Sequence, residues 1–178
     1  SLGHWTFLTG RRLAYRVYIS ATTRAKRGYQ MMRRVGKPPV PGKTYRSRPG
    51  VYAILPLKGR FLLTAQLRPE VDVQLPGGGV DLGESPLQTL HREVMEEIGW
   101  TIARPRRLGA FRRFAYMPEY DMWAEKICQV YVAHPVHQVA PPIEPDHATV
   151  VMSGEEAISV LGNDGDRFFL DRFLAMRP

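Results

Sequence analysis

The chain has 178 residues, 44% of them apolar and 24% charged, so it can bury the core of one domain and is not disordered throughout. Basic residues outnumber acidic ones by 25 to 17, a formal net charge of +8. The single cysteine, Cys128, excludes an intramolecular disulfide and a cysteine-rich zinc site. No apolar run reaches the roughly 18–20 residues of a membrane span, and no secretory signal pattern is found, so we expect a cytoplasmic protein.

Positive charge gathers at the N-terminal end of the chain. Residues 1–48 hold twelve basic residues and no Asp or Glu, whereas residues 49–178 carry 13 basic and 17 acidic residues, a net charge of −4. Residues 36–42 are rich in Pro and Gly, a composition typical of a linker. We therefore expect a basic arm over residues 1–42 and a separate domain over residues 43–178.

The arm itself has a helical pattern. Leu13, Val17 and Ala21 recur every four residues, which predicts an amphipathic basic helix from residue 11 to about residue 35. Four roles stay open for it: packing on its own domain or on a partner subunit in a homodimer, contact with RNA or polyphosphate, contact with a membrane surface, and an organelle transit segment.

Short β-like runs follow the linker. Residues 51–55 and 61–67 are apolar and are separated by Lys58-Gly59, a pattern that predicts a β-hairpin. Residues 73–79 end in three consecutive glycines, and we expect a loop there whose backbone adopts unusual angles.

The clearest helix covers residues 85–98. Ser85 is a favourable N-cap, Pro86 suits the first helical position, and Gln88 completes a capping box. Gly99 follows where a left-handed residue ends a helix.

The rest of the chain contains further predicted strands and helices. We expect strands over 108–116, 127–133 and 149–152, a Pro-rich loop over 134–145, and helices over 153–161 and 167–176. This order predicts an α/β or α+β sandwich.

Three glutamates share one arc of the helix over residues 85–98. At 100° per residue, Glu96, Glu93 and Glu97 lie within about 100° of each other, apart from the apolar stripe that faces the core. The one cation a turn away is Arg92, four residues before Glu96. A solvated acidic face is the ordinary interpretation of such a cluster. The alternative is a divalent-cation site, because Mg²⁺ or Mn²⁺ neutralises carboxylates that lack a countercharge.

The surrounding spacing favours the cation site. From Gly78 to Trp100 the sequence reads G-x5-E-x7-R-E-V-x-E-E-x-G-W, which resembles the Nudix box of the Nudix hydrolases, the MutT-like family. Seven fixed residue types match, and Trp100 departs from the smaller aliphatic residue usual at the last position. The resemblance covers about residues 49–178. It implies a Nudix-type α/β/α sandwich with a mixed β-sheet.

The resemblance also implies roles for individual residues. It implies a Mg²⁺- or Mn²⁺-dependent pyrophosphohydrolase that cleaves a nucleoside diphosphate linked to another moiety, a nucleoside triphosphate or a nucleotide-sugar. Catalysis would involve Glu93, Glu96, Glu97 and Arg92, and the metal ligands would be Glu93, Glu96, Glu97, Glu84 and a main-chain carbonyl near Gly77. Arg92 would orient a glutamate, and Gly78 and Gly79 would let the backbone approach phosphate.

Two points are not settled by the motif. The loop over residues 116–125 could bind the substrate through Glu119, Tyr120 and Trp123, with the two aromatic rings against a nucleotide base. Its acids Glu119, Asp121 and Glu125 are also candidates for the general base, although packing and solvated surface are the ordinary interpretations. The competing function is a nucleotide-sensing or RNA-binding module of the same fold that does not hydrolyse its ligand. Loss of a box glutamate would have favoured that alternative, and none is lost.

Overall fold

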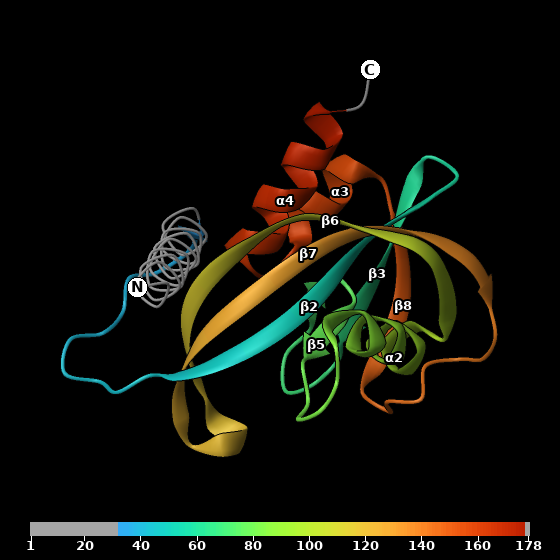
Figure 1. Ribbon diagram of the computed structural model, residues 1–178. Coiled ribbons are helices and arrows are strands. Elements are labelled where there is room, and N and C mark those ends of the chain that lie inside the picture. Colours follow the sequence, from blue (N-terminus) through green and yellow to red (C-terminus); the bar gives the residue numbers. More distant parts are fainter. Residues whose placement is uncertain (1–31, 177–178) are drawn as a thin grey trace, which may run out of the picture. The chain divides into compact units, whose positions relative to one another are not determined.

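The computed structural model describes residues 32–176 (Figure 1). The elements in chain order are β1 (Arg33–Arg34), β2 (Arg46–Leu57), β3 (Arg60–Gln66), β4 (Asp72–Gln74), β5 (Gly77–Gly79), α2 (Pro86–Ile98), β6 (Trp100–Met117), the 3-10 turn η1 (Pro118–Tyr120), β7 (Met122–Gln138), β8 (His147–Met152), α3 (Gly154–Val160) and α4 (Asp164–Ala175). Among these residues, no helix combines the length and the apolar character that crossing a membrane requires.

The strands form one mixed sheet. Its order is β1-β6-β7-β2-β3-β4, with β5 paired to β2 and β8 paired to β3. Strands β2 and β7 run parallel, whereas β2 and β3, β6 and β7, and β3 and β8 run antiparallel. In Figure 1, α2 lies over one face of the sheet, and α3 and α4 lie on the other.

Strand β2 is buried on both faces, and this explains its uninterrupted apolar run. Val51 and Ala53 pack with Leu90 and Val94 of α2, whereas Ile54 packs on the opposite side with residues of α3 and α4. Because successive side chains point to opposite faces, a strand between two helical layers needs apolar residues at every position. The expected α/β/α sandwich with a mixed sheet is confirmed.

The helix ends and the hairpin turn predicted from neighbouring residues are confirmed. Helix α2 has Ser85 as its N-cap with a capping box to Gln88, and Gly99 ends it with φ 69°. The β2–β3 hairpin turns at Lys58 and Gly59, both at positive φ. The second capping box, between Ser153 and Glu156, opens α3.

Several predicted elements have other bounds, or another type, in the structure. Residues 73–79 contain two short strands, β4 and β5, rather than a loop, because the glycine segment pairs with β2. Strands β6 and β7 run over 18 and 17 residues and take in part of the expected Pro-rich loop, because each completes the hydrogen-bonded ladder of the other. The end of the predicted basic helix is wrong too, since Arg33–Arg34 form β1. The rest of that helix lies outside the described residues.

One buried carboxylate joins α4 to the segment that leads into β5. Asp166 is fully buried, and its Oδ2 accepts a hydrogen bond from the backbone N–H of Leu75 at 3.1 Å. Its Oδ1 has no hydrogen-bond partner among the described residues. Burial raises the pKa of Asp166 from 3.8 to about 6, although the Leu75 N–H opposes that rise.

This burial predicts a pH-dependent stability that Asp166→Asn removes. Because the pKa of Asp166 is higher in the folded state than in the unfolded state, its stabilising contribution is complete below about pH 4 and is lost as the pH rises through about 6. Asparagine can still accept from Leu75 but carries no charge. Between pH 4 and pH 7.5, the free energy of unfolding of Asp166→Asn should therefore rise relative to the parent by roughly 3 kcal/mol, as measured by urea unfolding. A constant difference across that range would contradict the assignment.

Candidate active site

The site is built where α2 packs against the glycine strand β5. The helical repeat turns Glu93 and Glu97 inward, and only 8% and 7% of these residues are exposed. The N–H of Gly77 donates to Oε2 of Glu97 at 2.9 Å. A Cβ atom on Gly78 would lie 2.5 Å from the Glu93 carboxylate. The two carboxylates therefore rest directly on the backbone of β5.

Two of the three glycines are required by this geometry. Gly77 has φ 147°, a conformation that other residues rarely adopt, and a Cβ atom there would overlap the carbonyl oxygen of Val51. Gly78 leaves the space that the Glu93 carboxylate occupies. The sequence predicted a backbone with unusual angles at this point, and the structure shows what requires it: the close approach of β2 at Gly77 and of the Glu93 carboxylate at Gly78.

Arg92 is the centre of an ion-pair network. Its Nε and Nη2 donate to the two carboxylate oxygens of Glu84, both at 2.9 Å, while Nη1 lies 2.9 Å from oxygens of Glu93 and Glu96. The expectation that the glutamates lack a countercharge is therefore wrong for Glu93 and Glu96. The loop before α2 brings Glu84 back against the helix, and this holds the guanidinium between the acids. Arg92 and the hydroxyl of Thr89 lower the pKa of Glu84 to about 2.

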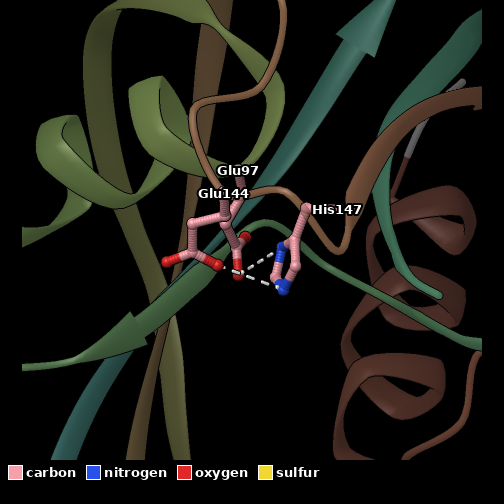
Figure 2. A group of neighbouring side chains, drawn as sticks. All are labelled: Glu97, Glu144 and His147. Atoms are coloured by element: carbon pink, nitrogen blue, oxygen red, sulfur yellow. Dashed lines mark ion pairs between the residues drawn. The ribbon is translucent and has the colours of Figure 1, made fainter. Parts of the chain in front are cut away.

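The sequence analysis missed two residues of the site, Glu144 and His147. Nδ1 of His147 lies 3.5 Å from Oε1 of Glu97, and its Nε2 lies 3.1 Å from Oε2 of Glu144. Figure 2 shows the three side chains pointing toward one another. The Glu144 loop is fixed on the end of α2, since the N–H groups of Ile143 and Glu144 both donate to the carbonyl of Glu96.

The donor atoms suit a hard divalent cation. One oxygen from each of Glu93, Glu96 and Glu144 lies within 4.8 Å of the others, and Glu97, Glu144 and His147 form a second such group. Carboxylate oxygens are the ligands that Mg²⁺ and Mn²⁺ prefer. Burial raises the pKa of Glu93 and raises that of Glu97 well above its usual range. A cation among these oxygens would offset the cost of burying charge.

Of the predicted substrate residues, Gly78 and Gly79 lie on β5, and Glu119, Tyr120 and Trp123 lie on the hairpin between β6 and β7. Tyr120 and Trp123 line a cavity of about 290 Å³ together with Arg46. The guanidinium of Arg48 lies 5.0 Å from the Tyr120 ring centre, and its Nη2 lies 3.7 Å from where a Cβ atom on Gly79 would be. Arg48 thus links the aromatic hairpin to the glycine strand.

Contacts are described for two of the three acids of that hairpin. Asp121 accepts a hydrogen bond from the Tyr116 hydroxyl. Glu125 lies 3.3 Å from Nη1 of Arg112. Glu119 is part of η1, and its side chain lies outside the described part of the chain. Both described acids have partners of their own on the hairpin.

The geometry agrees with comparisons to known proteins. The sequence matches the NUDIX domain family over residues 44–173, almost three quarters of the chain. The chain belongs to that family. The family expected from the box is therefore confirmed.

Over shorter stretches the chain is also similar to curated proteins. The chain is 42% identical over 57 residues to the RNA pyrophosphohydrolase of Helicobacter pylori strain G27. The aligned stretch is 29% of this chain and 37% of that protein. Over 52 residues it is 44% identical to the RNA pyrophosphohydrolase of Francisella tularensis subsp. mediasiatica strain FSC147, 29% of this chain and 34% of that protein. The chain thus spans little more than a third of the curated relatives that it matches.

Structural likeness extends further along the chain. A NUDIX hydrolase from Nitrosomonas europaea superposes with a TM-score of 0.61 at 15% identity, over 73% of this chain and 90% of that one. The MutT NUDIX hydrolase from Burkholderia pseudomallei superposes with a TM-score of 0.56 at 25% identity, over 71% of this chain and 97% of that one. The part of the sandwich that superposes has the fold of these NUDIX proteins.

The burial of the glutamates predicts opposite effects of two similar substitutions. Glu97→Gln should keep or raise the melting temperature of the metal-free protein at pH 8, because it removes a buried charge and its carbonyl can still accept from Gly77. Glu96→Gln should lower stability by roughly 0.5 kcal/mol, because it weakens the pair with Arg92. Thermal melts in EDTA compare the two. A clear loss of stability in Glu97→Gln would show that its carboxylate is a structural ion-pair partner instead.

Proposed function

We propose that the chain is a metal-dependent pyrophosphohydrolase that cleaves the phosphoric anhydride of a nucleoside diphosphate linked to another group. The observation that carries the proposal is the pair of inward carboxylates, Glu93 and Glu97, held against a strand without side chains. Membership of the NUDIX domain family and similarity to RNA pyrophosphohydrolases support it.

We assign the divalent cation to the acids that face this strand. Glu93, Glu96 and Glu97 would hold it, and a carbonyl near Gly77 stays a predicted further ligand. When bound, Mg²⁺ or Mn²⁺ neutralises phosphate oxygens and makes a bound water a better nucleophile. In this assignment Arg92 is a positioning residue, because its guanidinium fixes Glu84, Glu93 and Glu96 relative to one another.

A proton acceptor for the attacking water is also needed, and Glu144 is the candidate that the geometry favours. Its side chain is 44% exposed, so water can reach it, and it belongs to both groups of acids. His147 lies against its other side at 3.1 Å and can hold the carboxylate in place. We propose Glu144, held by His147, as the proton acceptor in place of Asp121 and Glu125. Asp121 accepts a hydrogen bond from Tyr116, and Glu125 pairs with Arg112.

The substrate proposed is a nucleoside triphosphate, either free or at the 5′ end of an RNA. The cavity beside Tyr120 and Trp123 offers aromatic faces for a base, and Arg46 and Arg48 lie beside it to receive phosphate. The names of the similar relatives support the RNA form. A nucleotide-sugar remains the alternative substrate.

We propose that residues 43–178 form the hydrolase domain and residues 1–42 a basic arm. The family match over residues 44–173 supports the domain. For the arm, contact with RNA agrees best with the proposed substrate, since its cations can neutralise phosphates.

The proposed function predicts that turnover depends on both the metal and Glu97. With Mg²⁺, the protein should release pyrophosphate or phosphate from at least one member of a panel of nucleoside triphosphates, 5′-triphosphate RNA and nucleotide-sugars. Glu97→Gln should lower kcat/KM by roughly 100-fold or more. The matched control is Glu155→Gln, the same chemical change at an exposed position of α3, which should leave turnover unchanged. Turnover by Glu97→Gln equal to that of the control would overturn the assignment.

A further inference from the structure

A second cavity lies where the β2–β3 turn meets the first part of β6. Its volume is about 550 Å³, in the range of small-molecule sites. Cations surround it and apolar side chains form part of its wall. The residues that matter here are Lys58, Arg104, Arg106 and His134, with Val132 and Phe173 as apolar neighbours. We call this the basic cavity.

The backbone of β6 is distorted where it supplies two of the cations. The pairing with β7 shifts register between Ala103 and Arg106, which marks a β-bulge. Arg104 within it has φ 51°, a conformation that costs a non-glycine residue about 1 kcal/mol or more. Bulges redirect side chains. Here the result is that Arg104 and Arg106 both line the same cavity.

Nothing negative lines the basic cavity. No Asp or Glu is among its lining residues, and within residues 32–176 no ion pair is found for Lys58, Arg104 or Arg106. The neighbouring Arg60 has an acidic partner, since its Nη2 lies 3.5 Å from Glu156. Three clustered cations without a counterion repel one another, and an apolar wall strengthens that repulsion by lowering the local dielectric. A bound polyanion would relieve it.

The basic cavity is separate from the candidate active site. Strand β3 runs between them: Gln66 at one end pairs with His147, and Arg60 at the other end follows the Lys58–Gly59 turn. At about 3.3 Å per residue, the two ends lie roughly 20 Å apart. A phosphate in the basic cavity therefore cannot be the one that Glu93 and Glu97 face.

We propose that the basic cavity is a second phosphate-binding site, distinct from the site of hydrolysis. Its ligand is a chain of phosphate groups, and two sources offer that chemistry: a free polyphosphate, as in a nucleotide, or the phosphodiester backbone of an RNA. Arg104 and Arg106 supply guanidinium groups that suit phosphate oxygens, and Lys58 and His134 add donors. The proposal does not depend on the proposed hydrolysis.

The test uses the full chain in EDTA and compares two double variants that each remove two charges. The cavity variant is Lys58→Asn with Arg106→Gln. Asparagine suits the positive φ of position 58, so the hairpin should fold. The control is Arg107→Gln with Arg172→Gln, both exposed and neither lining the cavity. Tripolyphosphate and a 5′-hydroxyl oligoribonucleotide are titrated by calorimetry at two salt concentrations.

We expect the cavity variant to bind at least one of these ligands about tenfold more weakly than the control does. Loss for tripolyphosphate alone identifies a free polyphosphate as the ligand, and loss for the oligoribonucleotide, with a smaller salt dependence, identifies RNA. The basic residues of positions 1–31 are the same in both variants, so their contribution cancels. Equal affinities of the two variants for both ligands would overturn the proposal.

Discussion

The structure depends on the contact between helix α2 and the glycine strand β5. The Gly77 N–H donates to the Glu97 carboxylate, and the missing side chain of Gly78 leaves the space that Glu93 fills. A hydrogen-bond donor at this point lowers the pKa of Glu97, but burial outweighs it and the pKa rises well above its usual range. The fold therefore holds two carboxylates in a place where their charge is unfavourable until a cation is bound.

The segment from Leu75 to Gly77 is held from both faces of the sheet. On one side Glu97 of α2 accepts from Gly77, and on the other Asp166 of α4 accepts from Leu75. Between them the carbonyl of Pro76 accepts from the N–H of Ala53 in β2. Three consecutive residues are thus fixed by three different elements. Such fixation suits a site that must place charges before its ligand arrives, because little reorganisation is then needed.

The sequence predicted well those features that depend on residues close together along the chain. Helix α2 was found from Ser85, Gln88 and Gly99, whose effects are local, and the spacing from Gly78 to Glu97 identified the face that carries the acids. Arg92 was expected to orient a glutamate, but its pairing with Glu84 was missed, because Glu84 reaches it only when the loop before the helix folds back. Glu144 and His147 were missed as well.

Their distance along the chain explains that failure. About fifty residues, including the whole of β6 and β7, separate His147 from Glu97, and the two meet only because β8 pairs with β3. No periodicity or motif in residues 134–147 indicates this contact. The lengths of β6 and β7 are likewise set by their mutual ladder and not by local propensity, so the proline content that predicted a loop from residue 134 did not indicate where β7 ends.

The central claim is that a divalent cation neutralises carboxylates whose pKa values burial has raised. The most direct measurement is the number of protons released when Mn²⁺ binds near pH 6, obtained by calorimetry in two buffers of different ionisation enthalpy. The account predicts saturable binding with net proton release, and weaker binding with less release in Glu97→Gln, because that residue then has no proton to lose. Binding without proton release, or binding unaffected by Glu97→Gln, would contradict it.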